Sequence, residues 1–165
     1  MRKLLLILSV FAFTATTSFS QDVLKRMPDA TLKDMNGKTV RISDLTKNGP
    51  VVISFWATWC APCKRELSAI ADVYDDWKEE TGVTVVAVST DDEKTKQNVP
   101  IYVNGKGWDY VVLMDPNGDF KRQMGVNIIP QTFLIDKNNN IVYTHSSYSP
   151  GDEEHLFEEI QKIAK

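Results

Sequence analysis

The sequence has no excess of positive charge: 19 lysine and arginine residues stand against 22 aspartate and glutamate residues, a net charge of −3. This balance offers no basic footprint for phosphates, so we expect no nucleic-acid partner. Internal repeats and low-complexity tracts are also missing. With 42% hydrophobic and 25% charged residues, the composition excludes collagen-like, coiled-coil and disordered chains. The 165 residues are enough for one well-formed core and short for two.

Histidine and cysteine are scarce, with two residues of each. His145 and His155 lie too far apart for the short spacing of paired histidines in structural zinc sites. We therefore expect no metal and no other cofactor, and we expect both histidines on the surface. The two cysteines fall in one tetrapeptide, at residues 60–63.

Long hydrophobic runs are few, and the run at the amino terminus is short. Arg2 and Lys3 precede an apolar stretch over residues 4–13, and polar and small residues follow it. The stretch is about half of the roughly 20 residues that span a bilayer, and this order is typical of a secretory signal peptide. We predict that residues 1–20 are removed, which leaves residues 21–165 as one soluble domain in the periplasm or another extracytoplasmic compartment. The alternative is an uncleaved leader that anchors the protein to a membrane.

Periodicity and turn residues predict a hairpin, two strands and a helix in the next part of the chain. An Asn-Gly turn predicts a hairpin over residues 28–45. The nearly unbroken apolar runs 51–56 and 83–88 are typical of strands buried on both faces. Between them, apolar residues at steps of three and four predict a helix that follows Cys63 and ends near Gly82. Its apolar stripe consists of Leu67, Ile70, Ala71, Tyr74 and Trp77.

The second half of the chain continues the alternation of strands and helices. The predicted elements are a polar helix over 92–105, a strand at 110–114, a short helix at 120–124, a hairpin of strands 132–135 and 141–144, and a last helix from Asp152. This order predicts an α/β domain with a central mixed, mostly parallel sheet and helices on both faces. We expect Trp56, Trp108 and Tyr110 in the core. No exposed apolar stripe stands out, so we expect a monomer.

The two cysteines lie where the first buried strand meets the first helix. At a helix start, unpaired backbone N–H groups and the positive end of the dipole face Cys60. Such a position can lower a thiol pKa from about 8.5 to about 3.5–7.5, and only the thiolate attacks a disulfide. Cys63 follows one helical turn later on the same side, so it can resolve a mixed disulfide. Pro62 suits the first turn because it lacks an N–H group that would have no partner there.

A purely structural disulfide is a weak explanation for this tetrapeptide. Closing so short a ring restrains the unfolded chain by roughly 2 kcal/mol, against about 3 for a fifteen-residue loop. Disulfides are permitted in an exported protein, so redox chemistry is the function that this spacing favours.

Two segments resemble the thioredoxin superfamily, and most closely its exported TlpA/ResA-like branch. Residues 55–64, FWATWCAPCK, resemble the active-site segment, and residues 128–136, IIPQTFLID, resemble the cis-proline loop and the strand after it. The resemblance covers residues 28–165, including the amino-terminal hairpin and an extra central helical segment near 92–107. It implies a thioredoxin fold and an exported thiol–disulfide oxidoreductase.

The resemblance also implies a role for individual residues. Cys60 corresponds to the attacking cysteine and Cys63 to the resolving one. Pro130 corresponds to the cis-proline that packs against the disulfide, and the backbone of Ile129 to the segment that pairs with an extended substrate. Trp59 corresponds to the aromatic residue that shields the cysteine pair.

Proton transfer in this chain cannot follow the pattern of many cytoplasmic thioredoxins. Those proteins carry a buried aspartate in the strand before the motif, where this chain has Ser54. Serine is no general base near neutral pH, so Glu66 or water must accept the proton that leaves Cys63. Glu66 corresponds to a glutamate beside the active site of ResA-like reductases that is thought to influence cysteine acidity. The alternative for Glu66 is a solvated helix residue near Lys64 and Arg65.

The function that we expect is the reduction of disulfides in exported proteins, including apocytochrome c, with a membrane thiol as electron donor. One alternative is a thiol peroxidase of the related redoxin group, which needs a proline and a Thr or Ser before its cysteine. The position that would matter for this arrangement is five residues before Thr58, and it lies in the apolar strand. The other alternative is a non-catalytic binding module, against which both cysteines and Pro130 argue because they are intact.

Overall fold

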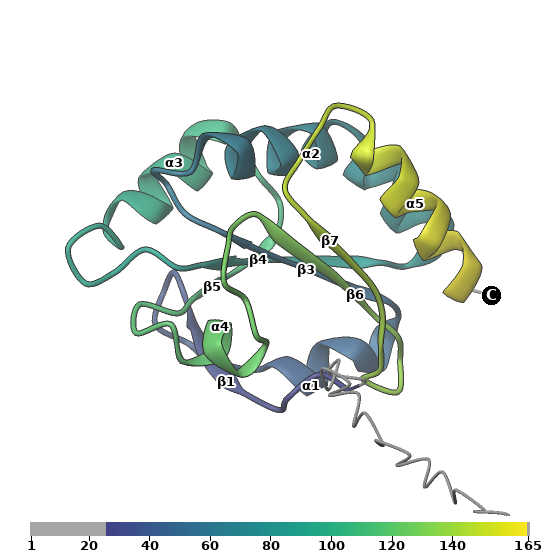
Figure 1. Ribbon diagram of the computed structural model, residues 1–165, viewed down its shortest axis with the longest axis horizontal. Coiled ribbons are helices and arrows are strands. Elements are labelled where there is room, and N and C mark those ends of the chain that lie inside the picture. Colours follow the sequence, from purple (N-terminus) through teal and green to yellow (C-terminus); the bar gives the residue numbers. More distant parts are fainter. Residues whose placement is uncertain (1–25, 165) are drawn as a thin grey trace, which may run out of the picture.

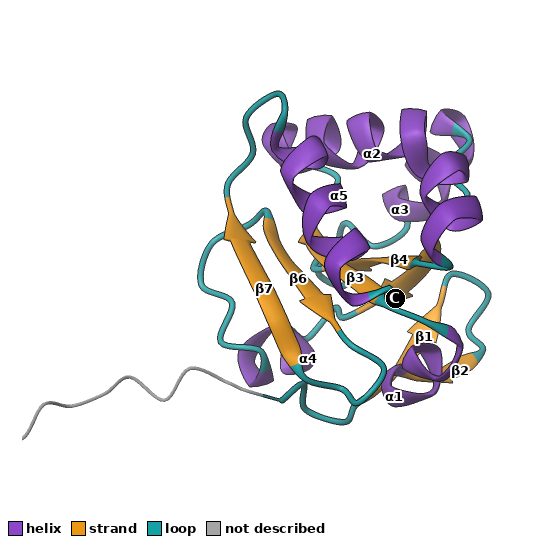
Figure 2. Ribbon diagram, turned by 90° about the vertical axis from the view of Figure 1, so that its right-hand side faces the viewer, coloured by secondary structure: helices purple, strands orange, loops and turns teal. Residues whose placement is uncertain are grey.

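The computed structural model describes residues 26–164, so the predicted leader lies outside the described residues. In this part of the chain seven strands form one sheet in the order β2-β1-β5-β4-β3-β6-β7, with helices on both faces (Figures 1 and 2). The strands are β1 (Thr31–Asp34), β2 (Thr39–Arg41), β3 (Val51–Trp56), β4 (Thr84–Ser89), β5 (Val111–Met114), β6 (Gln131–Ile135) and β7 (Ile141–Ser146). The helices are α1 (Ile42–Leu45), α2 (Ala61–Thr81), α3 (Asn98–Lys106), α4 (Asp119–Gln123) and α5 (Asp152–Ile163), and a 3-10 turn covers Thr46–Asn48.

The predicted α/β fold with a mixed sheet is confirmed, but the expectation of a mostly parallel sheet is wrong. Strand β4 pairs in parallel with β3 and with β5, whereas the other four pairings are antiparallel. The helical crossovers make only the centre parallel, and the hairpins β1–β2 and β6–β7 attach to its two sides in the opposite direction. Hydrophobic periodicity locates a strand, but it does not tell the direction in which that strand enters the sheet.

The extra central helix is shorter than predicted. Helix α3 begins at Asn98, not near residue 92. The carboxylate of Asp92 accepts hydrogen bonds from the N–H groups of Lys94 and Thr95 at 3.0 and 3.1 Å. These bonds hold a local turn that competes with a helix. Pro100 then falls in the first turn of α3, where a missing N–H group is tolerated.

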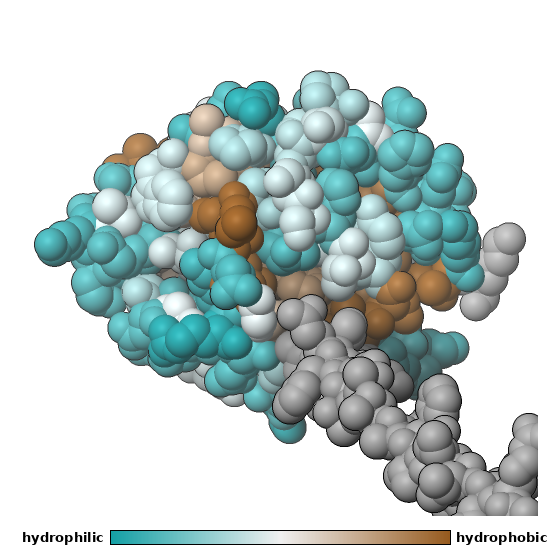
Figure 3. Space-filling model, viewed as in Figure 1, coloured by the Kyte–Doolittle hydropathy of each residue, from teal (hydrophilic) through white to brown (hydrophobic). Residues whose placement is uncertain are grey.

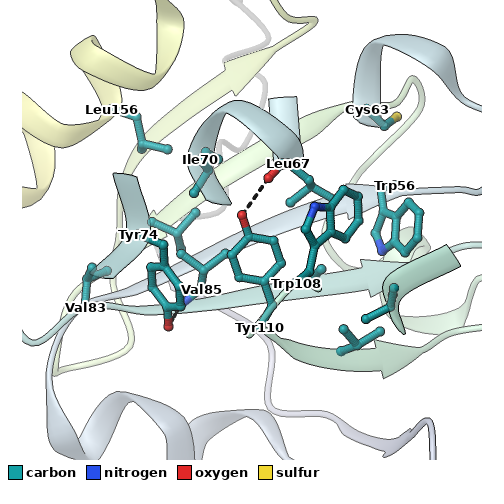
Figure 4. Packing of buried hydrophobic residues seen from close by; sticks show 14 of the residues in the cluster. Trp56, Cys63, Leu67, Ile70, Tyr74, Val83, Val85, Trp108, Tyr110 and Leu156 are labelled. Carbon is teal, nitrogen blue, oxygen red and sulfur yellow. Dashed lines mark hydrogen bonds between the residues drawn. The ribbon is translucent and has the colours of Figure 1, made fainter. Parts of the chain in front are cut away.

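The side chains of β3 alternate between two cores on opposite faces of the sheet. Trp56 belongs to the larger core, which α2, α3 and α5 cover (Figure 4). Phe55 points to the other face and packs on Phe120 and Phe133, with ring centroids 5.5 and 6.0 Å apart. Ser54 precedes Trp56 by two residues, so the same alternation directs it toward α2.

Helix α5 packs along the carboxyl-terminal half of α2. The rings of Trp77 and Phe157 stack with centroids 5.2 Å apart and an interplanar angle of 8°. Further along, the side-chain amide of Gln161 donates to Glu80 at 2.6 Å. Gly82 ends α2 as predicted, because its left-handed backbone (φ 67°) is one that glycine adopts without a steric cost. The far end of α5 therefore lies beside the far end of α2.

The aromatic residues expected in the core are buried. Trp56, Trp108 and Tyr110 are exposed by 0, 7 and 9%, and the phenol of Tyr110 donates to the carbonyl oxygen of Leu67 at 2.6 Å (Figure 4). The face drawn in Figure 3 is mostly hydrophilic, and its hydrophobic areas are small. Ile101 and Ile128 are among the few large apolar side chains that stay exposed.

Candidate active site

A disulfide joins Cys60 and Cys63 at the amino-terminal end of α2. Cys60 is the N-cap residue, and its Sγ accepts a hydrogen bond from the backbone N–H of Cys63 at 3.3 Å. Pro62 lies in the first turn of the helix. The first N–H groups of α2 and its dipole therefore face Cys60, which favours a thiolate there in the reduced protein.

The two cysteines differ in their exposure. Cys60 keeps an exposed fraction of 5%, whereas Cys63 has none. Trp59, next to Cys60, is exposed by 64%. Of the two cysteines, only Cys60 therefore keeps any surface that a partner molecule could contact, and it does so next to the exposed Trp59.

The loop before β6 approaches the disulfide from the other side. The peptide bond between Ile129 and Pro130 is cis. The carbonyl oxygen of Ile129 lies 3.9 Å from the Sγ of Cys60. The structure thus brings the two segments of the sequence resemblance into contact at the sulfur that a partner can reach.

Glu66 lies in α2, three residues after Cys63, and its carboxylate is buried between this helix and the sheet. Its side chain accepts hydrogen bonds from Thr132 Oγ1 at 2.7 Å and from Ser54 Oγ at 2.9 Å. The residue is exposed by only 4%, so the solvated alternative is wrong. Burial raises the pKa of Glu66, and the two hydroxyl hydrogen bonds offset part of this rise.

The sequence contained a signal for this burial. Glu66 follows Cys63 by three residues and precedes Ile70 by four, so it falls on the buried face of α2. Ser54 stands on the neighbouring strand where many thioredoxins have an acid. In this chain the carboxylate comes from the helix and the strand contributes a hydroxyl.

Asp91 is a site residue that the sequence analysis missed. Its carboxylate is fully buried and accepts hydrogen bonds from the N–H of Thr58 at 2.8 Å and from its hydroxyl at 2.5 Å. A third bond comes from the hydroxyl of Ser89 at 2.9 Å. Asp91 therefore positions the turn that carries Trp59 and Cys60, and it does so from the end of β4.

Replacing Asp91 with asparagine is expected to loosen this turn. The amide group supplies one acceptor oxygen in place of two, so at least one of the donors is left unpaired in a buried position. We expect the free energy of unfolding to fall by about 1–3 kcal/mol, and thiol–disulfide exchange to slow. Thermal denaturation and an insulin reduction assay measure the two effects. Asp76→Asn, at an exposed position of α2, is the matched control, and equal behaviour of the two variants would contradict the role of Asp91.

Within residues 26–164, no group of three or more His, Cys, Asp or Glu side chains is arranged to hold a metal ion. In the same residues no helix combines the length and the apolar character that a membrane crossing requires.

Known proteins are similar to this chain in both sequence and fold. Residues 23–144 match the AhpC/TSA family. The chain belongs to this family. A thiol-disulfide oxidoreductase ResA of Bacillus thuringiensis (strain Al Hakam) is 34% identical over 145 residues, which cover 84% of this chain and 82% of that protein.

Solved structures are similar to this chain in fold. An uncharacterized thioredoxin-like protein from Porphyromonas gingivalis is 44% identical, with a TM-score of 0.73 and coverage of 87% of this chain and 94% of that one. A putative thiol:disulfide interchange protein DsbE from Chlorobium tepidum is 29% identical, with a TM-score of 0.77 and coverage of 88 and 100%. The predicted membership of the thioredoxin superfamily, near ResA, is confirmed. So is the predicted enzyme class, a thiol–disulfide oxidoreductase.

Proposed function

We propose that this AhpC/TSA-family protein reduces the disulfides of other proteins outside the cytoplasm, with Cys60 and Cys63 as catalytic residues. The observation that carries the proposal is the disulfide at the start of α2 in which only Cys60 keeps exposed surface. Trp59 and Pro62 shape the surroundings of Cys60, Glu66 acts as proton acceptor, and Pro130 holds the opposing loop. The backbone of Ile129 is placed to pair with an extended segment of the substrate.

The reaction proceeds in two exchanges. The Cys60 thiolate attacks one sulfur of the substrate disulfide, a mixed disulfide forms, and the first substrate sulfur leaves as a thiolate that takes a proton from water. Cys63 then transfers its proton to the Glu66 carboxylate, and its thiolate attacks the Sγ of Cys60. The Cys60–Cys63 bond forms, the mixed disulfide breaks, and the second substrate sulfur leaves. The substrate gains two electrons, which the protein loses.

The partners and the compartment belong to the same proposal. The oxidised protein must recover two electrons from a dithiol, and we assign this step to a membrane thiol donor. The leader at residues 1–20 would direct the protein to the periplasm or an equivalent space, free in solution after cleavage or anchored without it. There a monomer would deliver electrons to oxidised cysteines such as those of apocytochrome c, as the resemblance to the ResA-like branch implies.

Trapping with Cys63→Ala tests the function directly. Without the resolving thiol the mixed disulfide persists, so partners are expected to accumulate as covalent adducts that dithiothreitol releases. Expression in the native compartment followed by mass spectrometry identifies them and shows whether they are substrates or donors. The double variant Cys60→Ala/Cys63→Ala is the control, and the proposal fails if it yields the same adducts or if Cys63→Ala yields none.

The two alternatives have less support. The position five residues before Thr58 is Ile53, a wholly buried residue of β3, which argues against the loop of a thiol peroxidase. Negligible consumption of peroxide with a thiol donor would separate the two enzymes. A non-catalytic binding module has no need of a disulfide at the start of a helix with one cysteine at the surface, and rapid thiol exchange would separate it from a reductase.

A further inference from the structure

A small cavity lies beside the buried residue Glu66. It lies between α2, β6, β7 and α5, and its volume is about 10 Å³. That is room for about one water molecule. The buried residues Glu66 and Thr132 line it, and His145, Tyr148 and Asp152 are among its other lining residues.

His145 is less exposed than a surface histidine would be, and its ring is held in place. The side chain of His145 is exposed by 32%, and its Nε2 lies 3.0 Å from Oδ2 of Asp152. The ring also stacks on Tyr143, with centroids 6.4 Å apart and an interplanar angle of 3°. The backbone N–H of Ser149 donates to the same Asp152 oxygen at 2.6 Å. That hydrogen bond, with the nearby His145, lowers the pKa of Asp152, so this carboxylate stays ionised beside the His145 ring.

The other ionisable groups around the cavity are acids or phenols. Asp152 and Glu153 face it from α5, Tyr143 from β7 and Tyr148 from the loop between them. A further phenol, that of Tyr110, lies near Glu66 from the segment before β5. Among the cavity-lining residues that the structure describes, His145 is the one that can become positively charged, and histidine changes its charge between about pH 5 and 8.

We propose that His145, oriented by Asp152, is a positioning residue that acts through Glu66: its charge sets the proton affinity of the Glu66 carboxylate across the cavity, and thereby the pH at which Cys63 can resolve a mixed disulfide. While His145 is protonated, its charge favours ionised Glu66, the form that accepts the Cys63 proton. Without that charge, the nearby carboxylate of Asp152 raises the pKa of Glu66 and so disfavours its ionised form. The resolution part of this inference rests on the proposed function, whereas the electrostatic part does not.

The electrostatic part is measured on the oxidised protein, in which neither cysteine titrates. Carbon NMR of labelled glutamate carboxyl groups follows Glu66, whose signal is the one missing from Glu66→Gln. In His145→Gln the titration midpoint of Glu66 is expected to rise by about 0.5–1 pH unit. The matched control is His155→Gln, because the side chain of His155 is 73% exposed and faces Glu158 on the outside of α5. This control is expected to leave the midpoint of Glu66 unchanged.

The reciprocal measurement guards against a structural effect of the His145 substitution. Because coupling between two sites is mutual, Glu66→Gln is expected to lower the midpoint of the His145 ring signals by about the same amount. The ring signals of His155 are expected to stay where they are. Unchanged midpoints of both Glu66 and His145 overturn the inference.

The kinetic part uses the reduced protein and Ellman's reagent, which releases one coloured thiolate on attack by Cys60 and a second on resolution by Cys63. In His145→Gln the pH profile of the second release is expected to move upward by about the same 0.5–1 unit, while the first release and the His155→Gln control match the unsubstituted protein. A shift in the spectra without a shift in the second release overturns the link to resolution. An unsubstituted protein without a second release contradicts the proposed function instead, and the spectra still decide the electrostatic part.

Discussion

Cys60→Ala is expected to abolish disulfide reduction. The residue supplies the attacking sulfur, and Cys63, which has no exposed surface, cannot reach a partner in its place. Loss of the nucleophile should therefore lower the rate of insulin reduction on the order of a thousandfold or more, to the rate of the uncatalysed reaction. The measurement is insulin turbidity with a small dithiol as electron donor.

Cys63→Ala is the informative comparison for this loss. It keeps the Cys60 thiol at the start of α2, so its first exchange with a disulfide should proceed at a normal rate and then stop at the mixed disulfide. Full activity of Cys60→Ala would defeat the mechanism, because it would mean that the reacting sulfur lies elsewhere.

Glu66→Gln is expected to stabilise the fold while it weakens the enzyme. Burial raises the pKa of Glu66, so the folded protein binds a proton more tightly than the unfolded chain, whose glutamate titrates near 4.3. The stability contributed by this proton is fully present below that value and is lost as the pH rises toward the folded-state pKa. Glutamine carries no charge and can still bond to both Ser54 and Thr132. We expect a gain of about 1–3 kcal/mol near neutral pH.

Urea denaturation at several pH values checks this expectation. The difference between Glu66→Gln and the unsubstituted protein should be near zero around pH 4 and should grow as the pH rises. Glu79→Gln, at an exposed position of the same helix, should show no such trend. A difference that does not change with pH would mean that Glu66 is no more protonated in the folded state than in the unfolded one. A buried acid that costs stability is expected where activity requires it.

The sequence allowed most of the fold to be predicted, because strands, helices and the two resemblance segments are local patterns. Long-range contacts lie beyond those patterns. The Glu66 carboxylate is held by Thr132, 66 positions along the chain, and the turn at Thr58 is held by Asp91, 33 positions away. Nothing near Asp91 in the sequence marks it as a site residue, since an aspartate after a strand is more often the start of a turn.

The direction of the strands that flank the parallel centre was unpredictable for a similar reason. Strands β1 and β6 join the sheet through partners that the chain reaches only after long connections, and either direction would bury the same apolar residues. The predicted start of α3 was wrong for a more local reason. The side chain of Asp92 bonds to the backbone of Lys94 and Thr95, and the helix begins only at Asn98.

The packing of α5 on α2 has a practical consequence. Because Gln161 bonds to Glu80, the described end of the chain lies beside the far end of a helix of 21 residues, which is about 30 Å long. The reactive disulfide occupies the opposite tip of that helix. An affinity tag, a fluorescent label or an attachment to a sensor surface placed after α5 would thus leave the redox tip free for an incoming protein.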